Sequence, residues 1–320
     1  MAISLFDPPD ALPQEIGILL IPEFSLICFS SITEPLRAAN TLNGGGLYRW
    51  RLYSEDGSPV RSSSGFEIAV EAPLEDADCP LLLVVASFHP ERHFSPRLAA
   101  WLRDQRRLGA LLGGLDTGSY ILARAGLLDG YRVTIHWEDL DLFAERFPGV
   151  DVVPDRFVVD GDRITAGGGT TALDMILAVI RAQHGHLLAL QVASQFIYDQ
   201  EHLPSDPQRA VAIRQVRAQA PAVATALEIM EETIEEPPAI AEIASRSGVS
   251  QKELERLFRK VLRTTPGQHF LGLRLATAER LLAQTALPIA EIAVRAGFTS
   301  APAFSRAYKT RFGRPPRAAR

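Results

Sequence analysis

The chain has 320 residues, of which 47% are hydrophobic, and its formal net charge is −5. Domains usually run to roughly 100–200 residues, so we expect two domains, and the hydrophobic content excludes disorder as a description of the whole chain. Two cysteines, Cys28 and Cys79, are too few for a disulfide framework and lack metal-ligand spacing. We therefore expect a reducing, cytoplasmic location, with neither a metal nor a cofactor.

The charge is divided unevenly along the chain. Residues 1–239 hold 18 Lys and Arg against 33 Asp and Glu, whereas residues 240–320 hold 15 against 5. An acidic part of net charge −15 therefore precedes a basic part of net charge +10. Such asymmetry indicates nucleic-acid binding by the basic part. The alternative is a basic face that contacts only solvent.

No segment is typical of membrane insertion or export. The first residues contain acids and prolines, without a basic start or a long apolar run, which argues against a signal peptide. Apolar runs such as Leu81–Ala86 are far shorter than the roughly 20 residues that span a membrane. We therefore expect no membrane partner.

The first 200 residues alternate between strand and helix patterns. Two short apolar runs, Ile16–Ile21 and Leu81–Ala86, are typical of strands that are buried on both faces. The other expected strands are Arg49–Ser54, Gly109–Leu115, Arg132–Ile135, Arg156–Asp160 and Arg163–Ala166, and the expected helices are Ser30–Leu42, Pro96–Arg106, Thr117–Ala125 and Thr171–Gln183. This alternation predicts an α/β fold with a doubly wound, mainly parallel sheet.

A boundary follows these elements. Leu203–Gln208 is a turn-rich break, a helical connector runs from it to about Ala220, and only helix patterns come after. We expect a first domain at 1–204, a linker at 205–222 and an all-α domain at 223–320.

The basic part repeats one pattern. Pro238–Arg246 and Pro288–Ala296 share the letters IAEIA, and each is followed by a glycine turn, Gly248 or Gly297. A second helix with a basic face follows each turn, at Gln251–Leu262 and Ala303–Phe312, and the long helix Gln268–Gln284 joins the two copies. Helix, tight turn and N-capped helix together describe a helix-turn-helix, so the sequence predicts two of them.

The second copy carries a family signature. Its residues are Gly297, Phe298, Phe304, Ser305, Arg306, Tyr308, Lys309, Phe312, Gly313 and Pro315. They resemble the signature of AraC/XylS-type transcriptional regulators, in which a long helix joins two helix-turn-helix units. Pro302 departs from the pattern, but proline is tolerated in the first turn of a helix. A helical bundle that does not bind DNA is the alternative.

The exposed faces of the second helices supply the expected DNA contacts. Two units on one face would meet successive major grooves, roughly 34 Å apart. The groove-facing residues that we expect are Gln251, Lys252, Glu255 and Arg256 in the first unit and Ser300, Ala303, Arg306 and Ala307 in the second. The expected phosphate contacts are Arg259, Lys260, Lys309, Arg311 and Arg314. For any single residue the alternative is a solvated helix face.

In the acidic part, the turn Gly113–Ser119 lies between a strand and a helix, where α/β proteins place a nucleophile. The free N–H groups of the helix start lie at the same turn. Together with Ala125–Gly130 and Thr134–Trp137, the turn resembles the class I glutamine amidotransferase-like, flavodoxin-like fold of the PfpI/ThiJ type. The resemblance covers about residues 15–200, and such domains fused to AraC/XylS-type units form a recognised group of regulators.

The residue at the turn bears on catalysis. In catalytic members of the PfpI/ThiJ type it is a cysteine with a histidine partner, whereas this chain has Asp116 beside the matching His136. By sequence position neither Cys28 nor Cys79 replaces the missing thiol. The resemblance therefore implies that the chain is not an enzyme. Two alternatives stay open, namely a PfpI/ThiJ-type amidase or hydrolase with an accessory helical domain, and a module that binds only other proteins.

The same turn suits a ligand. Asp116 attracts a cation, the helix N-terminus attracts a carboxylate, and aromatic rings bind quaternary ammonium groups. The residues that we expect around an effector are Asp116, Thr117, His136, Trp137, Phe24 and Phe88. Each also has a purely structural explanation, as a helix cap or as ordinary core. Asp-Thr-Gly at this turn resembles regulators that sense arginine or betaine- and carnitine-like compounds, which implies a cationic amino acid or a quaternary amine.

The sequence as a whole predicts a sequence-specific, DNA-binding transcriptional regulator that responds to a small metabolite. Its expected partners are double-stranded promoter DNA, the effector and a second copy of the chain. Activation, and with it contact to RNA polymerase, is what the family resemblance implies.

Overall fold

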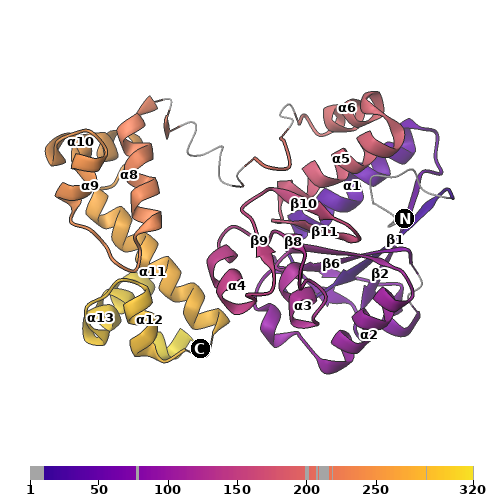
Figure 1. The fold of residues 1–320 in the computed structure, drawn as a ribbon, viewed down its shortest axis with the longest axis horizontal. Helices are drawn as coiled ribbons and strands as arrows, with labels where there is room; N and C mark the ends of the chain where they lie inside the picture. Colours follow the sequence, from indigo (N-terminus) through magenta and orange to yellow (C-terminus); the bar gives the residue numbers. More distant parts are fainter. Residues whose placement is uncertain are drawn as a thin grey trace. The chain divides into compact units, whose positions relative to one another are not determined.

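The structure, a computed structural model, describes residues 11–76, 79–198, 202–206, 208, 216–217, 219–285 and 287–319. It divides into two compact units, which we call the α/β unit (Met1–Gln208) and the helical unit (Arg209–Arg320) (Figure 1). This division falls within the predicted linker 205–222. Most of the helical connector expected there lies outside the described residues, so the extent of the linker stays a prediction.

A seven-stranded sheet of order β10-β11-β7-β6-β1-β2-β5 forms the centre of the α/β unit. All neighbouring strands are parallel except β10 and β11, which are antiparallel. The strands are β1 Gln14–Leu20, β2 Tyr48–Ser54, β5 Ala72–Pro73, β6 Leu81–Ala86, β7 Leu111–Asp116, β10 Phe157–Asp160 and β11 Arg163–Ala166. The predicted doubly wound, mainly parallel sheet is confirmed.

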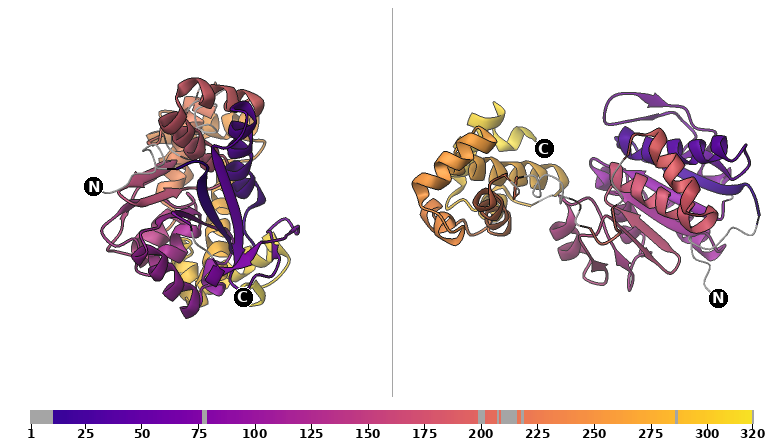
Figure 2. Two further views of the ribbon diagram at one scale, coloured as in Figure 1. Left: turned by 90° about the vertical axis from the view of Figure 1, so that its right-hand side faces the viewer. Right: turned by 90° about the horizontal axis from the view of Figure 1, so that it is seen from above.

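Helices cover both faces of the sheet (Figures 1 and 2). The helices of this unit are α1 Leu26–Leu42, α2 Pro96–Arg107, α3 Gly118–Arg124, α4 Leu140–Arg146, α5 Thr170–His184 and α6 His186–Gln195. One core lies between the sheet and α1, α5 and α6, and the other between the sheet and α2, α3 and α4. Side chains alternate between these cores along β1, with Ile18 in the first and Leu19 in the second, because successive residues of a strand face opposite ways.

Helix α1 and the strand expected at Arg132–Ile135 differ from the sequence expectation, and helices α4 and α6 were not expected from the sequence. Helix α1 begins four residues earlier than predicted, because Ser25 caps it and accepts a hydrogen bond from the backbone N–H of Cys28 at 3.4 Å. The predicted strand Arg132–Ile135 is shorter, as β8 (Arg132–Val133), and pairs with β9 (Asp151–Val152) in a small separate sheet. The ladder stops because the N–H of Thr134 donates to the Thr165 hydroxyl instead, at 2.8 Å.

Short two-residue strands and one-turn helices complete the α/β unit. They are the hairpin β3 (Val60–Arg61) and β4 (Glu67–Ile68), and the 3₁₀ turns η1 (Leu74–Asp76) and η2 (Pro90–Arg92).

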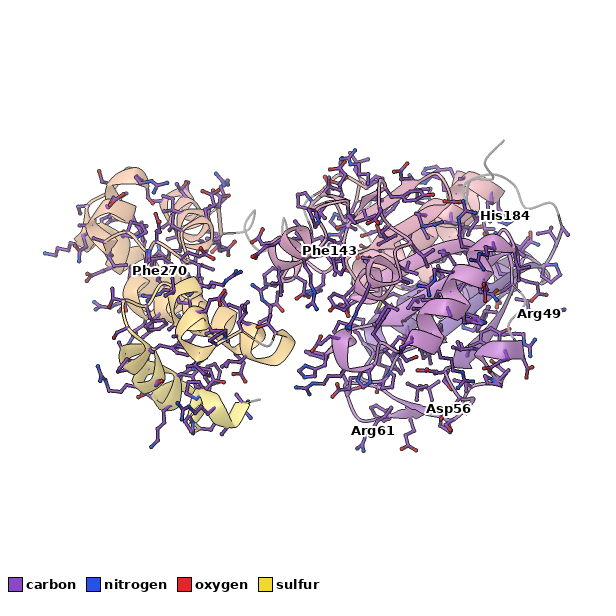
Figure 3. The ribbon with its side chains drawn as sticks, turned by 60° about the horizontal axis from the view of Figure 1, so that its bottom comes forward. Arg49, Asp56, Arg61, Phe143, His184 and Phe270 are labelled. Carbon is purple, nitrogen blue, oxygen red and sulfur yellow. The ribbon has the colours of Figure 1, made fainter. Side chains whose placement is uncertain are left out.

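The helical unit contains two helix-turn-helix arrangements joined by a long helix. Its helices are α8 Pro221–Glu232, α9 Ile240–Arg246, α10 Gln251–Leu262, α11 Pro266–Gln284, α12 Ile289–Arg295 and α13 Ala301–Phe312, followed by the 3₁₀ turn η3 Pro316–Ala319. Helix α11 has 19 residues and is about 28 Å long. Phe258 and Phe270 are buried between α8, α9, α10 and α11, and Phe270 is labelled in Figure 3. The two predicted copies of the repeat are confirmed as helices.

Among the residues that the structure describes, no helix combines the length and the apolar character needed to cross a membrane.

Candidate functional site

The direction of strand order reverses between β1 and β6 in the centre of the sheet. The chain passes from β1 to β2 on one side, and later from β6 to β7 on the other. In open α/β sheets, ligands bind beyond the carboxyl ends of the strands at such a reversal. Turns after β1, β6 and β7 therefore define the expected position of a binding site.

Three strained residues lie at these strand ends. Glu23 after β1, His89 after β6 and Asp116 at the end of β7 have φ angles of +64°, +51° and +60°. Residues other than glycine rarely adopt a positive φ angle, and such backbone strain is found most often at functional sites. We call the set Glu23, Ser87, His89, Asp116 and Thr117 the strand-end site.

Hydrogen bonds join the three turns to one another. The backbone N–H of Phe88 donates to the carbonyl oxygen of Glu23 at 3.4 Å, which joins the turns after β6 and β1. The Thr117 hydroxyl donates to the carbonyl oxygen of Ser87 at 2.7 Å, which joins the turns after β7 and β6. The side chains of the strand-end site are thus held on one connected backbone frame.

Close packing explains the glycines of the β7–α3 turn. A Cβ atom on Gly118 would lie 2.1 Å from the carbonyl oxygen of Val84, and one on Gly114 would lie 2.6 Å from the backbone nitrogen of Ser119. The absence of a side chain at these two glycines therefore allows α3 to pack closely on β6 and β7. The residue with the strained φ angle in this turn is Asp116.

Asp116 is buried, with 6% of its surface exposed. A Cβ atom on Gly168 would lie 2.6 Å from the Cβ of Asp116, so the glycine turn before α5 packs directly on this side chain. Burial, aided by the negative charges of Asp139 and Glu138, raises the pKa of Asp116 to about 8, although hydrogen bonds from Ser87 and Thr117 oppose the rise. At neutral pH the carboxyl group is thus mostly protonated.

Cys28 lies near the same carboxyl group. Burial raises the pKa of its thiol well above the ordinary value, the charge of Asp116 raises it further, and a hydrogen bond with the Gly169 backbone opposes the rise. From its position in the sequence, Cys28 was not expected to replace the missing thiol at the turn. The fold nevertheless brings the side chain of Cys28 near that of Asp116. A protonated, fully buried thiol is a poor nucleophile, so this proximity does not restore the thiolate of the catalytic relatives.

The other residues predicted around an effector have different environments. Thr117 is buried at the strand-end site, and His136 and Trp137 are half-buried neighbours with ring centroids 5.5 Å apart. Phe24 is fully buried in the core beside Phe29, whereas 56% of Phe88 is exposed. Their contact with an effector stays a prediction, and for Phe24 it would require the core to open.

Sequence reasoning missed several residues of the strand-end site. Glu23, Ser87 and His89 were not singled out, although they follow directly on the two strongest strand patterns, Ile16–Ile21 and Leu81–Ala86. Polar residues directly after buried strands were the available signal. The carboxylate of Glu23 lies 3.4 Å from Nε2 of His93.

Within the described part of the chain, no group of three or more His, Cys, Asp and Glu side chains is placed to hold a metal ion.

The helical unit carries the predicted DNA-binding residues on α10 and α13. Both helices are capped by a serine: Ser250 Oγ accepts from the N–H of Glu253 at 3.2 Å, and Ser300 Oγ accepts from the N–H of Ala303 at 3.4 Å. The exposed predicted residues are Gln251, Lys252, Arg256, Arg259, Ser300, Arg306 and Lys309, and the half-buried ones are Glu255, Ala303 and Ala307. The side chains of these ten residues are thus presented at or near the surface, and their DNA contacts stay predictions.

Three of the predicted groove residues, Gln251, Glu255 and Arg256, have side-chain partners on their own helix. The guanidinium group of Arg256 donates to both carboxylate oxygens of Glu253, at 2.8 and 2.6 Å. The amide of Gln251 donates to Glu255 at 3.1 Å. Exposed pairs of this kind contribute little to stability, so either donor can turn to a base edge at small cost.

Known families account for both units. The model of the DJ-1/PfpI family matches residues 19–182, and a helix-turn-helix domain model matches residues 243–320. The chain belongs to the AraC-type transcriptional regulators that carry a DJ-1/PfpI domain together with a helix-turn-helix domain. It is therefore a DNA-binding transcriptional regulator.

Relatives of similar length support this assignment. The chain is 42% identical to the HTH-type transcriptional regulator CdhR of Pseudomonas aeruginosa over 95% of this chain and 90% of that protein. It is 40% identical to the HTH-type transcriptional regulator GbdR of the same species, over 97% and 85%. Among solved structures, an AraC family transcriptional regulator from Pseudomonas putida is 30% identical, with a TM-score of 0.53, and covers 57% of this chain and 100% of that one.

The enzyme alternative finds a partial match. The isonitrile hydratase of Pseudomonas putida is 30% identical over 60% of this chain and 80% of that enzyme. The regulators CdhR and GbdR match both units at higher identity. The chain is thus a regulator and not an enzyme, as the sequence predicted.

Proposed function

We propose that the chain is a ligand-responsive transcriptional activator whose effector, a cationic amino acid or a quaternary amine, binds at the strand-end site. The observation that carries this proposal is the convergence of three strained residues, Glu23, His89 and Asp116, at the reversal of strand order. Asp139 and Glu138 lie close enough to Asp116 for their negative charges to raise its pKa, and such an acidic environment favours a cation. The exposed ring of Phe88 is available for a cation–π contact.

The raised pKa of Asp116 refines how a cation would bind. A buried carboxyl group that is protonated at neutral pH offers no charge until a positive group approaches. A cationic effector would then displace the proton, because a nearby positive charge favours the carboxylate. Binding would replace the proton on Asp116 by the positive group of the effector, so the buried carboxylate would not be left without a compensating charge.

A chain of contacts runs from Asp116 to the end of the α/β unit. Gly168 packs on Asp116, and a Cβ atom on the preceding Gly167 would lie 2.2 Å from the side-chain oxygen of Gln208. The amide nitrogen of Gln208 lies within hydrogen-bond distance of three acceptors, Thr134 Oγ1 and the carbonyl oxygens of Ile135 and Asp155, at 2.8–3.0 Å. Gln208 is the last residue of the α/β unit. A shift of the glycine turn on effector binding would therefore reach the segment that leads to the helical unit.

The remaining partners follow from the same proposal. One copy of the helical unit makes limited contact with DNA, and two linked copies that bind paired sites have a higher effective affinity. We therefore infer that the regulator acts as a homodimer. Activation implies contact with RNA polymerase. The site of action is the cytoplasm, where promoter DNA lies.

The experiment is isothermal titration of the full chain with glycine betaine, carnitine and arginine. The proposal predicts that at least one binds, and that Asp116→Ala abolishes the heat of binding while DNA affinity stays the same. Asp104→Ala is the control, because Asp104 is an exposed acid of the same unit that pairs with Arg107. An unchanged ligand affinity in the Asp116→Ala variant would contradict the proposed site.

A further inference from the structure

The two helix-turn-helix turns have the same backbone but different surroundings. Gly248 and Gly297 occupy the same place in the repeat, with φ angles of +75° and +71°. A Cβ atom on Gly248 would meet no atom within 4 Å, whereas one on Gly297 would lie 2.2 Å from the carbonyl oxygen of Ile234 and 2.9 Å from Cδ of Pro237. Ile234 and Pro237 lie between α8 and α9, at the entry to the first helix-turn-helix. The turn of the second helix-turn-helix is therefore packed against the entry to the first helix-turn-helix.

Arg274, in the middle of α11, holds this second turn. Its Nε donates to the carbonyl oxygen of Ala296 at 2.9 Å, and its Nη2 donates to that of Gly297 at 2.6 Å. Both carbonyls follow the C-terminal end of α12, where the negative end of the helix dipole favours a cation. The planar guanidinium group can bond both oxygens at once, which an ammonium group does with less fixed geometry.

The contact continues from Arg274 into the second recognition helix. The guanidinium carbon of Arg274 lies 4.3 Å from the ring centroid of Phe298. The Phe298 ring lies 5.3 Å from that of Phe304, which is fully buried on α13. Arg274 is thus connected through Phe298 to α13, and through Gly297 to the entry of the first helix-turn-helix.

We propose that Arg274 is a positioning residue that holds the two helix-turn-helix motifs of the helical unit together, so that the separation between α10 and α13 is fixed. Two recognition helices that enter successive major grooves must match the pitch of DNA, so a fixed separation selects the spacing of the two base motifs. The clamp at Arg274 and Gly297 would set this spacing without touching a base. The inference rests on DNA binding by the helical unit and is independent of the effector.

The direct test measures the distance between α10 and α13 in the full chain. Spin labels would be attached at Lys252→Cys and Lys309→Cys, both exposed positions, while the native Cys28 and Cys79 are buried. Pulsed dipolar spectroscopy should give a narrow distance distribution for the otherwise unchanged chain. Arg274→Ala should broaden or shift it, and Arg274→Lys should restore it in part.

The two glycines supply a matched pair of variants. Gly248→Ala and Gly297→Ala both place a side chain at positive φ, so both carry the same backbone strain. Only Gly297→Ala would also separate the second turn from Ile234 and should widen the distance distribution. This pair decides the question even where Arg274→Ala fails to fold. The proposal is overturned if Gly297→Ala leaves the distribution unchanged, or if Gly248→Ala alters it as much.

DNA supplies a functional measurement. Duplexes that the full chain selects from a random library would be compared with the same duplexes carrying one base pair inserted between the two base motifs. The insertion should weaken binding by the unchanged chain about tenfold or more, the size of a serious mismatch. The Arg274→Ala variant should lose much less on insertion, because its units can adjust. An equal loss in both proteins would contradict a positioning role.

Discussion

Asp116 combines a strained backbone with a carboxyl group that burial keeps protonated. Its pKa is raised from 3.8 to about 8, so between about pH 4 and pH 8 the folded state retains a proton that the unfolded state releases. The free energy of unfolding must then fall as the pH rises through this window, and the stabilising contribution is lost as the pH passes 8. The residue is therefore a source of pH dependence in the α/β unit.

The variant Asp116→Asn should remove that dependence, since an amide does not titrate. We expect the melting temperature of the variant, relative to the unchanged chain, to increase from pH 5 to about pH 8 and to level off above it. Differential scanning calorimetry of the full chain measures this on the transition of the α/β unit. Asp104→Asn, at an exposed acid, is the control. A difference between variant and unchanged chain that stays constant with pH would contradict the raised pKa.

Binding of a cationic effector should release the Asp116 proton. For whichever of glycine betaine, carnitine and arginine binds, the affinity should rise with pH by up to about tenfold per unit below pH 8 and level off above it. Titration calorimetry in two buffers of different ionisation enthalpy counts the protons released. The Asp116→Asn variant should show no such release. A pH-independent affinity in the unchanged chain would place the ligand elsewhere.

At the scale of elements, the recognition helices begin where the sequence places strong signals. Ser250 and Ser300 cap α10 and α13, and replacing such a cap by alanine costs about 1 kcal/mol. We expect Ser300→Ala to lower the stability of the helical unit by about this amount and Ser300→Asn to keep it, because asparagine also caps. Thermal unfolding measures both, with the mid-helix Ser305→Ala as control. If Ser300→Ala is as stable as the unchanged chain, the serine is not an effective cap.

The segment that ends the α/β unit should transmit effector binding. Gln208→Ala removes the amide that bonds Thr134, Ile135 and Asp155, so the effector should still bind but no longer change DNA affinity. Fluorescence anisotropy of labelled DNA with and without effector measures the response. Gln195→Ala, at an exposed position of α6, is the control. A normal response in the Gln208→Ala variant would exclude this route.

Elements with local signals could be predicted from the sequence, whereas contacts between distant elements could not. The apolar runs gave β1 and β6, and the repeated IAEIA segments gave both helix-turn-helix units, because burial patterns and caps are local in the chain. The approach of Cys28 to Asp116, and the packing of Gly297 on Ile234, depend on strand order and on how helices cross. A start signal as short as Ser25 was outweighed by the later apolar spacing, so the beginning of α1 was predicted too late.

At the scale of the whole molecule, the net charge of −5 is the sum of two opposed parts. The basic residues 240–320 include both recognition helices, and the acidic residues 1–239 include the strand-end site. Association with DNA through Lys and Arg releases counterions, so affinity must fall as salt concentration rises. A weakly acidic chain can therefore bind DNA strongly through one unit.

The most direct test of DNA recognition through α13 is a titration of selected duplex DNA with the full chain at several salt concentrations, for the unchanged chain and Arg306→Glu. We expect the logarithm of the binding constant to fall by about 0.9 per phosphate neutralised for each unit of log salt. Arg306→Glu should weaken binding about tenfold or more. Arg37→Glu, on the α/β unit, should leave it unchanged. An Arg306→Glu variant that binds DNA as tightly as the unchanged chain would contradict recognition through α13.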